Sequence, residues 1–194
     1  MPARRPATAR VRVDLRLAIL DAAAKLLAQG GPEALSVRRV AEQVGASTMV
    51  VYTHFHDKQG LVDAVLEHAF AGFAGALAAV EVADPWQHLR ALGHAYRSFA
   101  SARPDAYRLL FERCEPSVAV PGSAARAFEA LTVAIAKVMA ALDRPARDIE
   151  PFALDVWAAT HGIVQLELAG VIPAERADAT FEHMLDFIVA GLRG

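Results

Sequence analysis

Seven histidines and one cysteine are the first residues of this 194-residue chain to consider as metal ligands or catalytic groups. His54 and His56 are two residues apart, which places their rings on different faces of a helix, and the chain has no His-Glu-x-x-His motif. Cys114 is the only cysteine, so neither an intrachain disulfide nor a multi-cysteine zinc site can form. A glycine-rich phosphate loop is also absent. We therefore expect no catalytic residue, no metal site and no cofactor.

Contact with a polyanion is the other chemistry that the residues indicate. Residues 1–60 carry nine Lys+Arg and five Asp+Glu, a net charge of +4, whereas residues 61–194 carry 11 and 17, a net charge of −6. The two values add to the formal charge of −2 for the whole chain. This segregation favours a polyanion-binding N-terminal part joined to a part with another role, although charge alone is equally compatible with a basic terminus of no special function.

The elements that must position these charges are helices, because Ala and Leu outnumber β-branched residues and no hairpin signal is present. The fold class predicted is all-α, with about nine helices. Apolar periodicity and the Gly and Pro positions predict their bounds as 14–29, 37–44, 48–55, a helix after Asp57 that can continue to Val82, then 86–102, 105–114, 123–142, 147–170 and 174–192.

Two of these helices are short and closely spaced. Val37, Val40, Ala41 and Val44 share one face of the first, and Gly45 follows it in a position that suits a tight turn. The second has an inward pair, Val51 and Phe55. The pattern is that of a helix-turn-helix, in which the second helix enters a major groove. Periodicity alone also fits two helices of an ordinary bundle.

Individual residues of this region match a known family pattern. The stretch from about residue 14 to residue 66 resembles the N-terminal domain of the TetR family of transcriptional regulators. The matching residues are Ile19, Ala22, Ala23, Gly30, Leu35, Ser36, Val40, Ala41, Gly45, Ser47, Val51, Tyr52, His54, Phe55, Lys58 and Leu61. The resemblance implies an N-terminal three-helix DNA-binding domain followed by a helical domain for ligand binding and dimerisation.

The resemblance also implies roles for particular side chains. The positions of Ser36, Tyr52, His54 and Lys58 typically contact the DNA backbone, which sets register and salt dependence. Four further positions face base edges in the family, and here they are occupied by Arg38, Thr48, Met49 and Val50. Arg38 can bind guanine, whereas Val50, where the family usually has Thr, offers only apolar contact. The alternatives are a solvated Arg38 and a Tyr52 packed on the first helix.

For the residues after the DNA-binding domain, the resemblance implies a domain that binds a ligand and dimerises. Trp157, His161 and Gly162 resemble the Trp-His-Gly (WHG) signature of a C-terminal subclass of the family. We expect Trp157 and His161 to form a stacked pair that fills the core, with a ligand contact as the alternative. The last two helices form the usual dimer interface of the family. A stripe able to bury against a partner is formed by Phe181, Met184, Leu185, Ile188 and Leu192. Candidates for the effector pocket, with core packing as the alternative, are Phe73, Tyr96, Tyr107, Phe111, Phe128 and Trp157.

These expectations define the organisation of the chain: a basic disordered tail (1–13), a DNA-binding domain (14–60) and an effector-binding and dimerisation domain (61–194). Arg4, Arg5, Arg10 and Arg12 give the tail the means to enter a minor groove, and a solubilising role is equally compatible. We expect neither a signal peptide nor a membrane-spanning segment, because the longest stretch without charge or His has twelve residues, and so a cytoplasmic location.

The partners expected are double-stranded operator DNA with an inverted repeat, a second copy of the chain and an unknown small-molecule effector. The function expected is that of a homodimeric repressor that the effector releases from its operator. The alternatives are a transcriptional activator of the same family and a helical ligand-binding protein without specific DNA binding.

Overall fold

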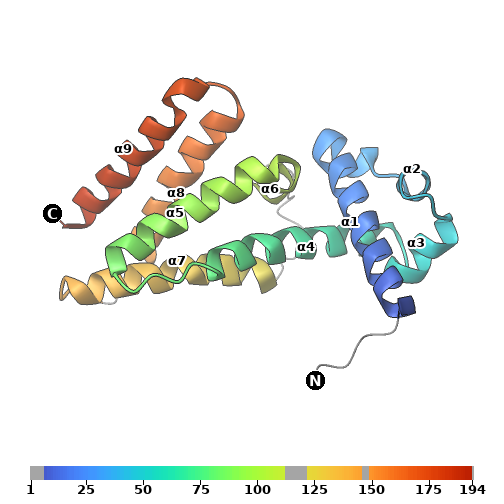
Figure 1. Cartoon of the computed structure of the whole chain (residues 1–194), viewed down its shortest axis with the longest axis horizontal. Helices are drawn as coiled ribbons and strands as arrows, with labels where there is room; N and C mark the ends of the chain where they lie inside the picture. Colours follow the sequence, from blue (N-terminus) through green and yellow to red (C-terminus); the bar gives the residue numbers. More distant parts are fainter. Residues whose placement is uncertain (1–6, 112–121, 146–148, 194) are drawn as a thin grey trace. The chain divides into compact units, whose positions relative to one another are not determined.

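The structure is a computed structural model that describes residues 7–111, 122–145 and 149–193. Within these ranges every regular element is an α-helix, which confirms the all-α prediction (Figure 1). The helices are α1 (Ala7–Ala34), α2 (Val37–Gln43), α3 (Thr48–Phe55), α4 (Lys58–Ala78), α5 (Pro85–Ala102), α6 (Pro104–Phe111), α7 (Gly122–Ala141), α8 (Ile149–Leu168) and α9 (Ala174–Arg193).

The largest differences from the expected bounds are in α1. This helix begins at Ala7, so residues 7–13, expected in the disordered tail, are helical. The stretch after Pro6 consists of Ala, Thr, Val and Arg, and its Ala and Arg residues are good helix formers, which explains the earlier start. At the other end Gly31 interrupts the helix with φ 68° and ψ −165°, and one further turn follows to Ala34. Cys114 lies outside the described residues.

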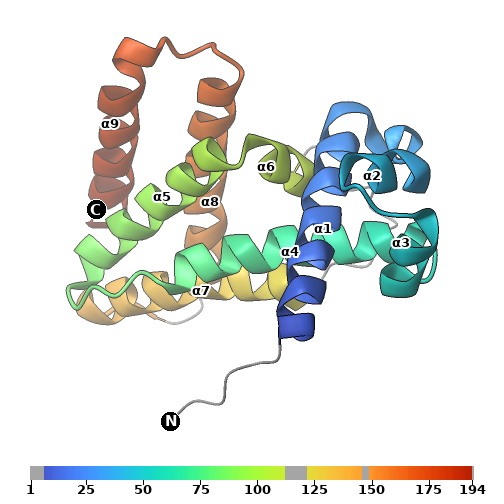
Figure 2. The same cartoon turned by 45° about the vertical axis from the view of Figure 1, so that its right-hand side comes forward.

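The chain divides into two compact units, and the first comprises residues 1–70 and 105–121. Here α1, α2 and α3 surround an apolar core together with the first part of α4 (Figure 2). Ile19, Val40, Val51 and Leu61 each have at most 1% of their surface exposed. On top of this packing, the guanidinium carbon of Arg16 lies 5.2 Å from the centre of the Phe55 ring, a cation–π contact between α1 and α3.

The turn between α2 and α3 has the geometry that the sequence predicts. Gly45 adopts φ +65°, the left-handed conformation that glycine tolerates best. The backbone N–H of Ala46 donates to the carbonyl of Ala41 at 2.9 Å, which closes the end of α2. Ser47 then precedes α3 as its N-cap, where its hydroxyl accepts from the N–H of Val50 at 3.4 Å. The backbone bond thus ends α2 and the cap bond begins α3, with only a short turn between them.

The second unit comprises residues 71–104 and 122–194. Packed pairs of helices form it: α5 contacts α7 and α8, α7 contacts α8, and α8 and α9 lie side by side (Figure 1). Its most completely buried side chains include Ile135, Val138, Met139 and Phe181.

Helix α9 faces its own core with the stripe that the sequence assigned to a partner, so that assignment was wrong. Phe181, Leu185, Ile188 and Leu192 are at most 9% exposed within the single chain, and Met184 is half-buried. The close packing against α5 depends on Gly93, where an added Cβ would lie 2.8 Å from Cδ2 of Leu185. Amphipathicity revealed that α9 has a buried face, but it does not distinguish burial within a chain from burial between chains.

Helix α4 is long and apolar enough, by length and composition, to cross a membrane, the one helix of the described residues that is. It is also a core helix, since Leu61, Val65, Phe73 and Leu77 are buried inside the molecule. A buried helix of a globular protein has the same composition, so this apolar stretch is explained by core packing.

The joint between α3 and α4 gives the first prediction. A Cβ at Gly60 would lie 2.2 Å from the carbonyl oxygen of Phe55, a backbone atom that no rotamer change can move away. We expect Gly60→Ala to lower the free energy of unfolding by about 3 kcal/mol or more, measured by urea denaturation. Gly45→Ala, strained only by its positive φ, is expected to cost about 1–2 kcal/mol.

Gly75→Ala is the matched control for this prediction. Gly75 lies inside α4 with no atom within 4 Å of an added Cβ, so the substitution should stabilise the protein by about 0.5–1 kcal/mol. A Gly60→Ala protein as stable as the Gly75→Ala protein would contradict the steric argument.

Candidate nucleic-acid interface and effector pocket

Helix α3 has one buried and one exposed side. Val51 and Phe55 are 1% and 3% exposed and pack into the first unit. On the opposite side Met49 is 72% exposed and Tyr52 is 45% exposed, and Thr48 is exposed as well. Met49 and Tyr52 therefore present an apolar and an aromatic side chain to solvent on the side of α3 that is predicted to face DNA. The exposure of Tyr52 also argues against the alternative in which it packs on α1.

Arg38 extends from α2 next to this surface. Its side chain is 83% exposed, and its Nε donates to Oε1 of Glu42, one turn away, at 2.9 Å. An exposed pair of this kind contributes only about 0.3–0.5 kcal/mol. Arg38 can therefore leave Glu42 at little cost. Its exposure fits the solvated alternative, and contact with a guanine edge stays a prediction.

The positions predicted to contact the DNA backbone lie on the three consecutive helices around the turn. Ser36 is the N-cap residue of α2 and makes no side-chain cap bond. Lys58 is exposed at the first position of α4, whereas His54 and Val50 are half-buried on α3. The structure thus places all eight predicted residues on α2, α3 and their flanks. Contact with DNA itself stays a prediction.

A cavity lies within the second unit, with a volume of about 70 Å³. Four of the six predicted pocket residues line it: Phe73, Tyr96, Phe128 and Trp157. Tyr107 and Phe111 are not among the lining residues. They belong to α6, in the first unit, where their ring centres are 4.9 Å apart. The rest of the wall, which the sequence analysis missed, is Leu77, Leu89, Arg90, Leu92, Gly93, Ala127, Leu131, Val156, Thr160, Leu185, Ile188 and Val189.

Aromatic contacts hold two parts of this wall. The ring of Phe73 meets that of Tyr96 edge-on, with centres 5.1 Å apart, and Phe128 lies 5.8 Å from Trp157 in a tilted arrangement. The hydroxyl of Tyr96 and Nδ1 of His161 are 2.9 Å apart, a hydrogen bond. Trp157 retains 36% exposure, so the expected core-filling role for this residue was wrong: it forms a cavity wall.

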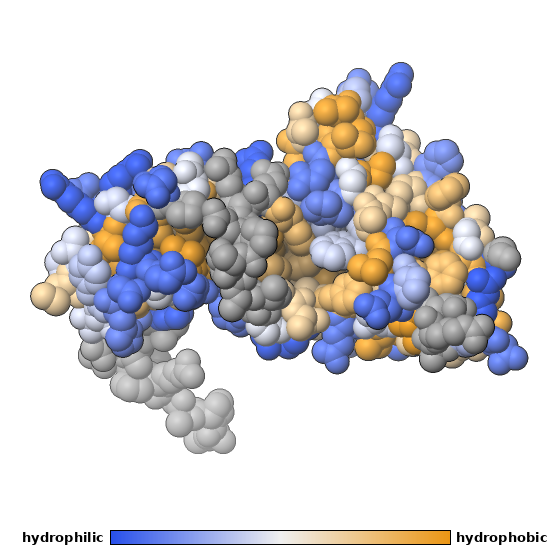
Figure 3. Space-filling model, turned by 180° about the vertical axis from the view of Figure 1, so that it is seen from behind, coloured by the Kyte–Doolittle hydropathy of each residue, from blue (hydrophilic) through white to orange (hydrophobic). Residues whose placement is uncertain are grey.

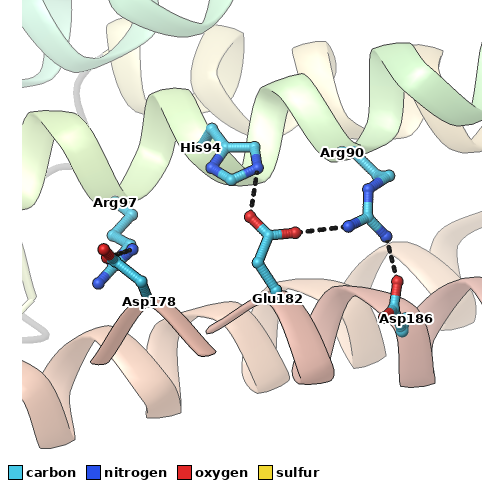
Figure 4. A network of polar contacts seen from close by, with 6 residues as sticks. All are labelled: Arg90, His94, Arg97, Asp178, Glu182 and Asp186. Atoms are coloured by element: carbon cyan, nitrogen blue, oxygen red, sulfur yellow. Dashed lines mark hydrogen bonds and ion pairs between the residues drawn. The ribbon is translucent and has the colours of Figure 1, made fainter. Parts of the chain in front are cut away.

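Arg90 brings an ion-pair network to the edge of the cavity. Its two terminal nitrogens donate to Asp186 at 2.6 Å and to Glu182 at 2.5 Å (Figure 4). The other carboxylate oxygen of Glu182 is 3.1 Å from Nε2 of His94. All of these contacts join α5 to α9. The two residues on each helix are four positions apart, which is about one helical turn.

Arg97 extends the network of α5 to both α8, through Glu167, and α9, through Asp178. It donates to Glu167 through Nε and to Asp178 through Nη1, both at 2.8 Å, and its guanidinium carbon is 4.8 Å from the centre of the Phe181 ring. Hydrogen bonds and the charges of the two carboxylates outweigh burial, so the pKa of Arg97 is raised and the side chain is permanently charged.

His88, next to the lining residue Leu89, is a buried polar residue that the sequence did not single out. Nζ of Lys137 lies 3.3 Å from its Nδ1. Burial, and after it the positive charge of Lys137, lower the pKa of His88. The imidazole is therefore neutral at pH 7 and accepts the hydrogen bond from Lys137.

Comparison with known proteins adds to this geometry. Residues 19–65 match the family described as bacterial regulatory proteins, tetR family, and residues 89–188 match the tetracyclin repressor-like C-terminal domain. The HTH-type transcriptional repressor Rv3405c of Mycobacterium tuberculosis is 36% identical over 108 residues. That alignment covers 53% of this chain and 56% of the relative, about half of each.

Solved structures resemble the whole described chain. A protein of unknown function from Rhodococcus sp. RHA1 has a TM-score of 0.79 at 26% identity, covering 93% of this chain and 96% of that one. The regulator FadR from Bacillus subtilis, solved in complex with stearoyl-CoA, has a TM-score of 0.74 at 14% identity, with coverages of 90% and 98%. The two family matches together include more than half of the chain, its helix-turn-helix and its cavity. This chain belongs to the TetR family of bacterial transcriptional regulators.

Proposed function

We propose that the protein is a cytoplasmic homodimeric repressor that binds an inverted-repeat operator and is released from it by a small-molecule effector. The observation that carries the proposal is the two-sided α3, with Val51 and Phe55 buried and Met49 and Tyr52 exposed. The name of the Mycobacterium tuberculosis relative, a transcriptional repressor, supports repression, whereas the name of a 34% identical relative from Mycolicibacterium smegmatis, the activator FasR, supports the alternative of activation.

In this proposal the exposed side of α3 lies in the major groove. Thr48, Met49 and Val50 meet base edges together with Arg38, while Ser36, Tyr52, His54 and Lys58 bind the backbone. Met49 and Val50 have no strong hydrogen-bonding group, so their preference is for thymine methyl groups. The basic segment before Asp14 adds phosphate contacts, which lie outside the side chains described.

Dimerisation follows from apolar side chains that α8 and α9 leave uncovered. Leu154, Leu166, Val171 and Phe187 are 46%, 43%, 65% and 75% exposed. Hydrophobic surface gathers at the connection between α8 and α9 (Figure 3). The residues between them on α8 include Ala158 and Gly162, which permit close approach of a second helix pair. A homodimer carries two copies of α3, which suits an operator with two half-sites about 34–36 Å apart.

Effector release uses α4, which is shared by both units. Phe73 and Leu77 of α4 line the cavity, and its first residue, Lys58, is a proposed phosphate contact. A ligand that favours one placement of these two side chains shifts the population of α4 orientations, and so of α3. Trp157 and His161, the proposed WHG residues, contribute a wall residue and the partner of Tyr96. The FadR complex shows that a regulator of this fold holds a ligand.

Selection of binding sites from random DNA, followed by protection mapping on the DNA flanking the gene, tests the proposal. The expected result is an inverted repeat protected on two successive turns of one face. Recovery of no specific site would leave the chain as a helical ligand-binding protein without specific DNA binding.

Substitutions at Arg38 and Lys58 are expected to affect different properties of DNA binding: base preference at Arg38 and salt dependence at Lys58. Lys58→Gln removes one phosphate contact, so the slope of log affinity against log salt should become shallower by about 0.9 for each protomer on every sequence. Arg38→Gln should instead cost about 1–3 kcal/mol on the selected site and relax the base preference at one position of each half-site. Fluorescence anisotropy on selected and scrambled duplexes measures both.

The matched control for both variants is Arg103→Gln, which removes an exposed positive charge from the second unit. Its salt slope should equal that of the unaltered protein. A slope changed as much by Arg103→Gln as by Lys58→Gln would show that total charge, and not the proposed contact, determines the salt dependence.

The dimer face gives a further prediction. Phe187→Glu places a charge in the middle of the proposed apolar contact, and sedimentation velocity should then show a monomer at concentrations at which the unaltered chain is a dimer. Val133→Glu is the control, because Val133 on α7 is 45% exposed and lies outside this face. Dimers that persist in Phe187→Glu and dissociate in Val133→Glu would place the interface elsewhere.

A further inference from the structure

The cavity of the second unit is unusual in the charge of its wall. Among its lining residues only Arg90 is charged, and nearly all the others are aliphatic or aromatic. Two neutral hydroxyl groups, those of Thr160 and Tyr96, are present on lining residues. The described lining residues include no carboxylate, so a cationic ligand inside the cavity would have no ion-pair partner on the wall itself.

The charge of Arg90 is already neutralised by two carboxylates of α9 that lie outside the cavity wall. Asp186 and Glu182 accept from its two terminal nitrogens at 2.6 and 2.5 Å, and neither carboxylate lines the cavity. Two carboxylates against one guanidinium leave an excess negative charge, to which His94, 3.1 Å from Glu182, adds a positive charge only when protonated. A carboxylate ligand arriving at Arg90 would be the third anion on one cation, so it would be repelled as well as desolvated.

From this arrangement we infer that the cavity takes a small, uncharged, apolar ligand with one or two hydrogen-bonding groups, and that Glu182 and Asp186 exclude carboxylates by occupying Arg90. The inference rests on the proposed function in taking this cavity as the effector site. It names a ligand class that the similarity to FadR does not supply. The cavity volume of about 70 Å³ is room for about five water molecules, which favours a small ligand.

A pair of probes that differ only in charge tests the ligand class. The chain has two tryptophans, and Trp86, which lies under the guanidinium of Arg193 at 4.7 Å, is not a lining residue. In Trp86→Phe, therefore, the fluorescence of Trp157 reports on the cavity alone. 1-Hexanol should bind this variant at least ten times more tightly than hexanoate at pH 7.5, and hexylammonium should also bind at least ten times more weakly than hexanol. Equal or tighter binding of either ion, or no binding of hexanol, overturns the inference.

Glu182→Gln combined with Asp186→Asn, in the Trp86→Phe background, tests the exclusion of carboxylates. The double replacement leaves Arg90 without an anionic partner on α9, so hexanoate should bind at least ten times more tightly than before, while the affinity for hexanol changes less than three-fold. This is a gain of binding, which a misfolded protein cannot give. Unchanged hexanoate affinity in a protein that still binds hexanol would refute the role of the two carboxylates.

Asp178→Asn is the matched control. Asp178 pairs with Arg97 in the same row of α5–α9 contacts, but Arg97 does not line the cavity. This variant should leave hexanoate binding unchanged; a comparable gain would mean that net charge, and not Arg90, governs the selection.

Operator release by hexanol is measured separately. Tight hexanol binding without release would contradict the proposed effector mechanism and leave the ligand class standing.

Discussion

Burial of Val51 and Phe55 is the interaction on which the DNA-binding unit depends. The two side chains are one turn apart on α3 and almost fully buried, and Arg16 covers the Phe55 ring from α1. Burying a pair of this size contributes about 3–6 kcal/mol, far more than the cap bond of Ser47 can. Since α3 has only eight residues, fixing this side leaves a single orientation for Met49 and Tyr52. Local packing thus determines which residues can meet DNA.

Much of the fold was predictable because this sequence contains many prolines and glycines at positions where helices begin or end. Prolines and glycines bound α5, α7 and α9 within one or two residues of the expected ends, and α3 has the expected bounds. The start of α1 was not predictable from apolar spacing, because residues 7–13 contain mainly Ala, Val and Arg, which extend a helix without an inward stripe. The kink of α1 at Gly31 could not be predicted from the sequence either, because it is visible only in the backbone angles of that residue.

The cavity was predictable only in part. Aromatic side chains stand out in a sequence, so Phe73, Tyr96, Phe128 and Trp157 were found, whereas the aliphatic part of the wall has the same pattern as any helix core. Arg90 could not be recognised either. An i, i+4, i+7 series of Arg90, His94 and Arg97 is typical of a solvated helix face, and only the arrangement of α9 shows that it meets Asp178, Glu182 and Asp186 (Figure 4).

The close approach at Gly60 packs the start of α4 directly against the end of α3. There is no room for even a methyl group between Gly60 and the Phe55 carbonyl, so in the mechanism proposed above a movement of the start of α4 also displaces the end of α3. Helix α4 has 21 residues and is therefore about 31 Å long. A tilt of about 5° displaces one end relative to the other by about 2.7 Å, close to the length of a hydrogen bond. In the mechanism proposed above, a displacement of this size is enough to break a hydrogen bond between the protein and the DNA groove.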